Sequence, residues 1–317
     1  MNNKAGKIIL ITAAIMLPVG ILIAAMGLRL GGKSAWGYDL RNMKYMETGK
    51  ASENTMELKE FDTLTVDITS ADVYLTTGNS YSFSYRVQEG REPEVDQTGS
   101  ELRIRQPVVV SAFVGFNMGV TGDRYDITVP EDCKEIELKF SGSSGELTVE
   151  RVAVTGTCKV LSGEVSLSGF DSKGLEIDAA SGDIVVAGVN ADSLRVKASS
   201  GEITVRDGAF QDLQVEASSG DISVSNVKTD SFTSDVSSGT VNVNRVEAQT
   251  VNSELTSGDI TLDLIGNAED YDFDINVTSG EISVNGADAG DRYVNEAGKA
   301  KKIKVEATSG DIEIRLN

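Results

Sequence analysis

A Ser-Gly dipeptide, usually followed by Asp or Glu, recurs from residue 144 to the end of the chain. Its glycines are separated by 18 residues, then by five intervals of 19, then by 22 and 30. A period of this length is typical of solenoids, in which each repeat forms one coil of a stack. The sequence therefore predicts stacked coils with a tight turn at each of nine glycines: Gly145, Gly163, Gly182, Gly201, Gly220, Gly239, Gly258, Gly280 and Gly310.

Apolar and polar residues alternate on both sides of each glycine. Leu194, Val196 and Ala198 precede Gly201, and Ile203 follows it. A period of two is that of a half-buried strand, and the glycine breaks the phase so that the chain can turn. We therefore predict an all-β fold, a parallel β-solenoid (β-helix) with coils of about 19 residues. A second corner of each coil is predicted at Phe170, Val189, Val227, Val246 and Ile265.

The two ends of the array depart from this period. Residues 64–75 fit the template with Ala71 in the glycine place, and strands are expected near 81–87, 101–105 and 125–129. We expect the insertion 288–302 to fold over one face, and the final coil, Ile303–Asn317, to lack a cap. An uncapped strand edge invites self-association. The predicted solenoid has an irregular N-terminal capping part, 55–143, and regular repeats, 144–317.

An uncharged apolar segment lies near the N-terminus. Residues 8–28 contain no charged side chain, and a helix of this length spans roughly 30 Å, the thickness of a bilayer core. We predict a short tail (1–7), a transmembrane helix (8–28) and a polar juxtamembrane linker (29–54). The alternative is a cleaved signal peptide. Basic residues flank the segment on both sides, so the charge pattern leaves open whether the solenoid is extracytoplasmic, as we expect, or cytoplasmic.

The composition excludes several classes of function. The chain has 49 acidic and 29 basic residues and a net charge of -20, which argues against nucleic-acid binding. It has no histidine, which removes the common nucleophilic triads and His-ligated zinc. Cys133 and Cys158 are expected to face inward one coil apart, either as a disulfide or as two buried thiols. We expect no cofactor.

Acidic residues beside the turns form the most suggestive constellation. Stacking would place them about 4.8 Å apart, where a divalent cation could bind through oxygen ligands. The alternative is a row of solvated turn residues whose repulsion is screened. The turn serines are predicted to form a hydroxyl ladder. The candidate acidic ladder comprises Asp183, Glu202, Asp221, Asp259, Glu281 and Asp311.

No catalytic site is predicted. Polysaccharide-cleaving β-helix enzymes use carboxylates that converge in a cleft, whereas the acidic residues here lie in regular columns. This pattern disfavours catalysis, and a carbohydrate-active enzyme stays only as an alternative. The apolar segment 107–120 is expected to pack as cap or core; otherwise it would form an exposed patch for a partner or the nearby membrane.

The repeated Ser-Gly-Asp/Glu-Ile-x-Val copies, the opening segment 64–75 and the Ile127-Thr128-Val129-Pro130 strand end together resemble the bacterial "putative adhesin" family, domain of unknown function 4097. The resemblance covers roughly residues 55–317. It implies a β-solenoid, often tethered to the membrane and facing outward, with no catalytic residues to transfer.

From these observations we predict a function. The chain is expected to be a non-catalytic, membrane-tethered, extracytoplasmic module with adhesin-like binding or a structural role in the cell envelope. Its expected partner is a protein or an envelope glycan. A cytoplasm-facing regulatory scaffold is the alternative.

Overall fold

The structure is a computed structural model that describes residues 16–20, 23, 26, 35–39, 44–47, 51–108, 111–115 and 122–317. The chain divides into two compact units. In the first unit, β1 (Ala35–Asp39) lies antiparallel between β2 (Lys44–Glu47) and β9 (Ser111–Gly115). The second unit comprises Glu53–Val87, Glu92–Pro107 and Gly122–Asn317.

The predicted tail 1–7 and most of the predicted transmembrane helix 8–28 lie outside the described residues. Residues 16–20 are helical, as are Ile23 and Met26, whose side chains are 67% and 60% exposed. Across the part of the chain that is described, no helix has the length and apolar character needed to cross a bilayer. The segment 29–54, predicted as a linker, contains β1, β2 and the first residues of β3 (Ala51–Glu57).

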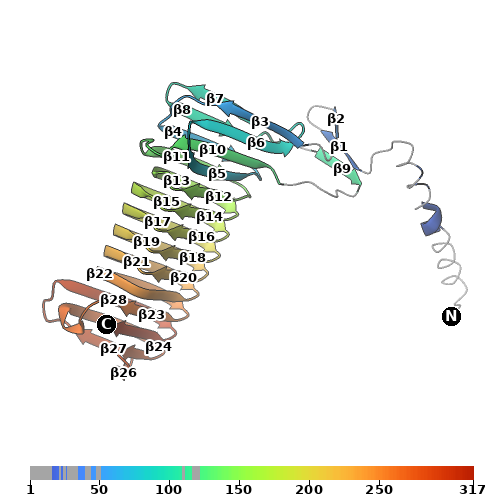
Figure 1. Ribbon diagram of the computed structural model, residues 1–317. Helices are drawn as coiled ribbons and strands as arrows, with labels where there is room; N and C mark the ends of the chain where they lie inside the picture. Colours follow the sequence, from blue (N-terminus) through green and yellow to red (C-terminus); the bar gives the residue numbers. More distant parts are fainter. Residues whose placement is uncertain are drawn as a thin grey trace, which may run out of the picture. The chain divides into compact units, whose positions relative to one another are not determined.

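Two parallel sheets, joined by the glycine turns, form the regular part of the second unit (Figure 1). Long strands precede each turn: β11 (Ile136–Gly142), β13 (Val154–Ser162), β15 (Asp171–Ser181), β17 (Asn190–Ser200), β19 (Ala209–Ser219) and β21 (Lys228–Ser238). Short strands follow: β12 (Leu147–Glu150), β14 (Val165–Ser168), β16 (Ile184–Ala187), β18 (Ile203–Arg206) and β20 (Ile222–Ser225). The 17-residue β22 (Val241–Ser257) pairs in both sheets.

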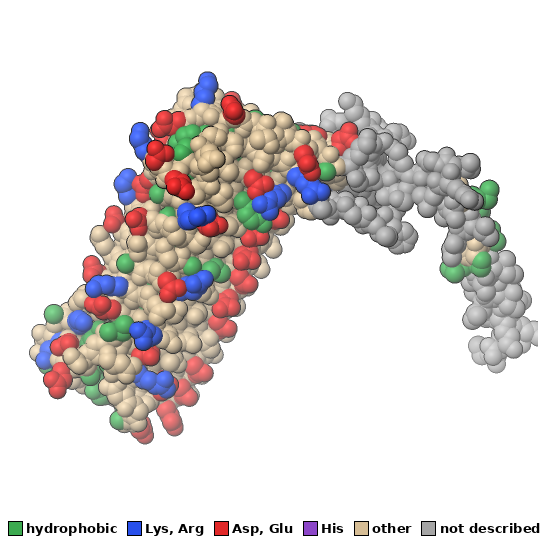
Figure 2. Space-filling view, in the orientation of Figure 1, with side chains coloured by type: hydrophobic (Ala, Val, Ile, Leu, Met, Phe, Trp, Pro, Cys, Tyr) green, Lys and Arg blue, Asp and Glu red, His purple; other side chains and the backbone are tan. Residues whose placement is uncertain are grey.

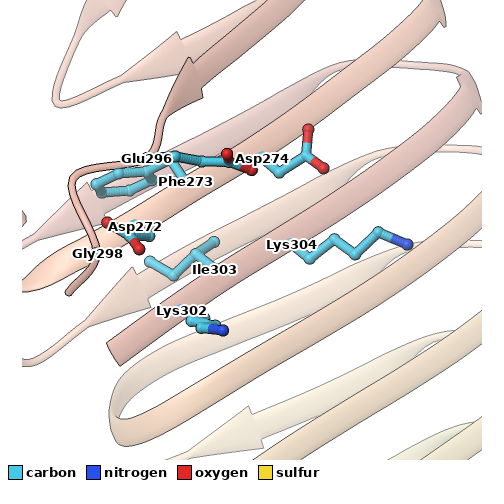
Figure 3. Close-up of a pocket in the computed structure, with 8 residues that line it drawn as sticks. All are labelled: Asp272, Phe273, Asp274, Glu296, Gly298, Lys302, Ile303 and Lys304. Atoms are coloured by element: carbon cyan, nitrogen blue, oxygen red, sulfur yellow. The ribbon is translucent and has the colours of Figure 1, made fainter. Parts of the chain in front are cut away.

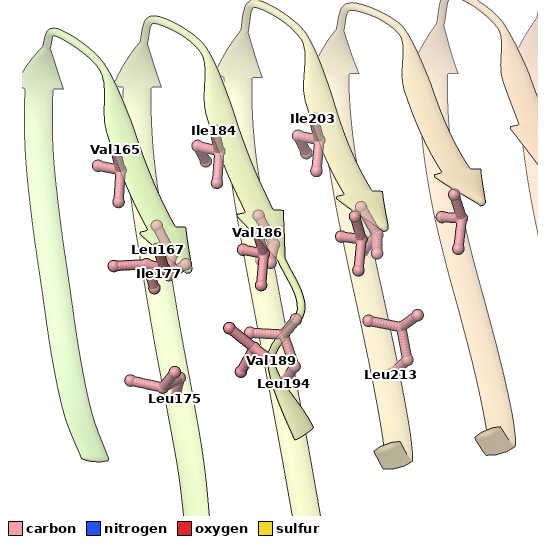
Figure 4. Packing of buried hydrophobic residues seen from close by; sticks show 14 of the residues in the cluster. Val165, Leu167, Leu175, Ile177, Ile184, Val186, Val189, Leu194, Ile203 and Leu213 are labelled. Carbon is pink, nitrogen blue, oxygen red and sulfur yellow. The ribbon is translucent and has the colours of Figure 1, made fainter. Parts of the chain in front are cut away.

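The core consists of the inward-facing residues of both sheets (Figure 4). Leu194 stacks in register between Leu175 and Leu213, and all three side chains are buried. Ile203 and Val205, from the opposite sheet, are completely buried. Each such side chain contributes about 1.5–3 kcal/mol relative to exposure. The predicted all-β solenoid is confirmed.

The turn glycines also stack in a column. Gly201 has a φ of 117°, and a Cβ atom at this residue would collide with the carbonyl oxygen of Gly182 in the preceding coil. The column begins at Ala71, which lies against Gly145. Ala71 thus occupies the glycine place of the repeat, as the fit of residues 64–75 to the repeat pattern predicts. Glycine is required in the column because a side chain would meet the backbone of the neighbouring coil.

The C-terminal coil lies inside the stack and not at its end. β28 (Lys301–Ser309) pairs in parallel with β22 on one edge and with β24 (Tyr271–Ser279) on the other. β29 (Ile312–Leu316) lies in the same way between β23 (Ile260–Leu264) and β25 (Ile282–Val284). The expectation that the final coil offers an open edge for self-association is therefore wrong, because both of its edges are occupied.

Antiparallel strands cover this end of the solenoid. β27 (Arg292–Asn295) pairs with β24, and β26 (Ala287–Asp288) pairs with β25. Both strands come from the insertion 288–302 or its border. The strands of the insertion thus continue the two sheets as a cap, while its residues 296–300 pass over the outer face of β24, in agreement with the expectation that the insertion folds over one face.

The N-terminal end repeats this arrangement. β8 (Glu101–Arg105) and β10 (Arg124–Pro130) stack outside the earlier coil formed by β4 (Thr63–Ile68) and β5 (Asp72–Gly78). β7 (Glu94–Thr98) and β6 (Ser82–Gln88) then add antiparallel to β8 and β10. β3 pairs with β6 at the outer edge. Strands predicted near 81–87, 101–105 and 125–129 are present as β6, β8 and β10.

Two core expectations are wrong. Phe140, not Cys133, stands one coil before Cys158. Both cysteines are free thiols, as one of the two alternatives expected, but only Cys158 is buried. Cys133 lies in the connection between β10 and β11, where the coil period does not hold. Ile265, predicted at the second corner, is 42% exposed, because a register shift after Asn244 places the buried Leu264 opposite Val246 instead.

Candidate binding groove

Because the C-terminal coil is inserted between two earlier coils, the chain must cross over β24 at this end of the solenoid. β27 and β28 lie on opposite edges of β24, so the residues that connect them, 296–300, must pass over that strand. Asp272, near the start of β24, holds this crossover. Its Oδ1 accepts the backbone N–H of Ala297 at 2.8 Å, and its Oδ2 accepts that of Lys299 at 3.0 Å.

The crossover creates a concavity of about 530 Å³ beside the outer face of the sheet. Figure 3 shows acidic side chains from β24 and the crossover, and basic side chains from β28. The residues that line this crossover groove are Asp272, Phe273, Asp274, Glu296, Gly298, Lys302, Ile303 and Lys304. Phe273 and Ile303 are buried in the core, so the groups available to a ligand are largely charged.

Two of these charged groups are already engaged. The N–H of Lys299, together with those of Ala297 and Gly298, lowers the pKa of the Asp272 carboxyl. Lys304 Nζ lies 3.0 Å from Glu306 Oε1, and this hydrogen-bonded ion pair raises the Lys304 pKa. Within the described part of the chain, no ion pair shorter than 4.0 Å involves Asp274, Glu296 or Lys302.

The predicted acidic ladder runs along the turn edge of the solenoid, where Figure 2 shows a row of acidic side chains. Its aspartates bond to backbone. Asp183 Oδ1 accepts the N–H of Glu202 at 2.9 Å, and Asp311 Oδ1 accepts that of Glu281 at 3.0 Å. Asp221 accepts the N–H of Thr240 in the same way. These carboxylates tie one coil to the next, which is a structural role.

Coil stacking sets the positions of the ladder carboxylates and of the turn serines. Among the described residues, no group of three or more Asp, Glu or Cys side chains is placed to hold a metal ion. The turn serines stack in register, as in the pairs Ser200 with Ser219 and Ser238 with Ser257. They are exposed, and the predicted ladder of their hydroxyl groups stays a prediction.

The apolar segment 107–120 lies only partly within the described residues. Its residues 111–115 form β9, in the first unit, and Val108 is 60% exposed. Sequence reasoning missed the crossover groove. The available signal was the 30-residue interval between Gly280 and Gly310, since a lengthened interval in a regular array marks a place where chain leaves the stack.

The fold defines a class: a parallel β-solenoid whose two ends are capped by antiparallel strands. The family comparison matches residues 61–315 to the Toastrack family, domain of unknown function 4097. The match covers most of the sequence, and the chain belongs to this family.

The search of the solved structures also finds matches. They include a "putative adhesin" from Bacteroides fragilis, 12% identical with a TM-score of 0.42, covering 85% of this chain and 98% of that one. Another is a "putative lipid binding protein" from Parabacteroides distasonis, 14% identical with a TM-score of 0.38, covering 85% and 97%. A "putative cell adhesion protein" from Clostridium sporogenes is 13% identical with a TM-score of 0.26, covering 84% and 100%. The search of the curated proteins finds no match.

Proposed function

We propose that the chain is a membrane-tethered, extracytoplasmic, adhesin-like binding module without catalytic activity. One observation carries this proposal. The second unit is entered through β3, at the outer edge of one end of the solenoid, whereas the crossover groove lies at the opposite end. A chain anchored by its N-terminal segment would therefore hold the groove at the far end of a rigid spacer.

The anchor is supported by the N-terminal sequence. Residues 8–28 are uncharged, and the helical residues Met16, Leu17 and Ile23 expose more than 60% of their surface. Large apolar side chains of this kind are stable in lipid and costly in water. The preceding basic residues, Lys4 and Lys7, are typical of exported chains.

The solenoid is suited to holding a binding site away from the N-terminal anchor. Each regular strand is hydrogen-bonded to a neighbour on both sides. At the C-terminal end the edge strands β26 and β27 have only 2 and 4 residues, and short edge strands limit unwanted pairing. Partners would therefore meet the side faces or the groove. The net charge of -20 keeps neighbouring molecules apart. Regular columns of hydrogen-bonded carboxylates support binding or spacing better than glycan cleavage.

The placement of the solenoid is tested by labelling intact cells. Glu269 is exposed, so Glu269→Cys in the full chain with Cys133→Ser provides a single accessible thiol. A membrane-impermeant maleimide should label this variant before lysis and leave the Cys133→Ser parent unlabelled. Labelling that appears only after lysis would overturn the proposal and favour the cytoplasm-facing scaffold.

The non-catalytic part of the proposal has a separate test. Purified full chain is incubated with cell-envelope glycan, and the reducing ends and fragment sizes are measured. Unchanged glycan is expected. Shortened glycan would replace the binding module with a carbohydrate-active enzyme.

A further inference from the structure

The crossover groove has one wall that is fixed before any ligand arrives. Asp272 binds two backbone N–H groups of the crossover, at 2.8 and 3.0 Å, so the segment that carries Glu296 is held over the sheet. A wall that is already ordered removes part of the entropy cost of binding. The groove therefore has one preformed wall, whereas the rest of this sheet face is regular.

The groove presents two carboxylates from different segments. Asp274 lies opposite Val294 in the β24–β27 pairing, and Glu296 is two residues beyond Val294. Glu296 therefore follows β27 directly, as the first residue of the crossover. Both line the groove (Figure 3). An ammonium group has three donors and no acceptor, so two carboxylates are suitable partners for it.

Basic side chains of β28 lie near these carboxylates. Lys304 is opposite Asp274 but is paired with Glu306. Lys302, two residues earlier on β28, is opposite Asp272, whose carboxylate accepts the two crossover N–H groups, and it lines the same groove. Two residues along a strand and one strand across amount to roughly 8 Å between Cα atoms. An extended dipeptide spans about 7 Å, which is comparable with this separation.

We propose that the crossover groove binds a zwitterionic peptide unit of about dipeptide length. Its ammonium group lies between Asp274 and Glu296, and its carboxylate lies at Lys302. This assignment rests on the proposed binding function and names the chemical class of ligand. A volume of about 530 Å³ accommodates a unit of this size together with water.

The charge requirement is tested with three small probes on purified full chain in detergent. The probes are L-alanyl-L-alanine, its N-acetyl derivative and its C-terminal amide, with L-alanine as a length control. Binding is measured by saturation-transfer NMR. The free dipeptide should bind in the millimolar range, and each modified probe, as well as alanine, should bind at least about fivefold more weakly.

Matched variants locate the binding. Asp274→Asn with Glu296→Gln should abolish the preference for the free ammonium, and Lys302→Met should abolish the preference for the free carboxylate. β15 supplies a control on the same sheet, because Glu176→Gln with Asp178→Asn makes the same changes on exposed side chains away from the groove. Lys159→Met, on exposed Lys159 of β13, is the control for lysine. Control variants should retain both preferences.

Two results would overturn the inference: no dipeptide binding at 20 mM probe, which is roughly twentyfold above a millimolar dissociation constant, or binding that the groove variants leave unchanged. Each is separable from the proposed display function. Surface labelling of Glu269→Cys with no dipeptide binding would remove only the ligand assignment. Dipeptide binding without surface labelling would keep the groove and reject the extracytoplasmic placement.

Discussion

The backbone N–H of Asp311 donates to the carboxylate of Asp259 at 2.9 Å, although 52 residues separate the two along the chain. This bond is one rung of the column that elsewhere joins consecutive coils. Asp311 in turn accepts the N–H of Glu281 at 3.0 Å. The coil that contains Asp311 is thus held on both sides by coils that precede it in the chain.

Gly310→Ala should therefore destabilise the protein strongly. Gly310 has a φ of 126°, and an added Cβ would collide with the carbonyl oxygen of Gly258. We expect a loss of about 3 kcal/mol in the free energy of unfolding, measured by urea denaturation. Gly290→Ala is the control, since its φ is 75° but nothing lies within 4 Å; its cost should be about 1–2 kcal/mol. Equal losses would show that Gly310 is not in a packed column.

Two buried hydroxyl groups in the core should be energetically coupled. Ser234 and Ser253 are completely buried, and their Oγ atoms are 2.7 Å apart. Ser234→Ala alone leaves the other hydroxyl without this partner and should cost about 1–3 kcal/mol. Replacing both serines should cost less than the sum of the single changes. A double-mutant cycle measures the coupling, with exposed Ser218→Ala expected within about 0.5 kcal/mol of wild type; strict additivity would contradict the prediction.

The two cysteines should differ sharply in reactivity. Burial raises the pKa of Cys158 to about 12, so its thiolate is scarce at neutral pH and its side chain is shielded. Burial and the Asp132 charge raise the Cys133 pKa, but this residue is partly exposed. A thiol reagent at pH 8 should slowly modify one cysteine per native chain and two after denaturation. Cys133→Ser should abolish the native reaction; a persisting reaction would show that Cys158 is accessible.

The coil itself could be predicted because its signals are local. Alternation around Gly201 gives both strands, and the side chain directions follow from the period alone. The interleaved ends could not be predicted in this way. Ser309-Gly310-Asp311 fits equally well against any coil, since every coil offers the same edge and the same register. The order of coils depends on which strands cap the end, and that is set by tertiary packing.

The candidate sites show the same division. The spacing of Asp183 and Asp221 correctly places them beside the turns, but it does not reveal that aspartate reaches the backbone N–H of the next coil. The groove residues Asp274, Glu296 and Lys302 are brought together by a crossover that exists only because β28 inserts beside β24. A site created by non-sequential stacking leaves no motif in the sequence.

The crossover should loosen at low pH. The N–H of Lys299, with those of Ala297 and Gly298, lowers the Asp272 pKa below its ordinary value of 3.8. A lowered pKa means that the folded state favours the carboxylate, so this stabilisation is fully present above pH values near 3.8 and is lost as the pH falls through the lower, folded value. The amide proton resonances of Ala297 and Lys299 should move together with a midpoint below 3.8.

Asp272→Asn provides the matched control for this titration. The asparagine does not ionise, so the same two amide resonances should no longer show the shared acid transition, while the solenoid keeps its circular dichroism spectrum. A midpoint at or above 3.8 in the wild-type chain, or a transition that survives in Asp272→Asn, would show that another group governs the crossover. Loss of the transition in the variant would assign the fixed wall of the groove to the Asp272 carboxylate, because no other acidic group is bonded to these two N–H groups in the described structure.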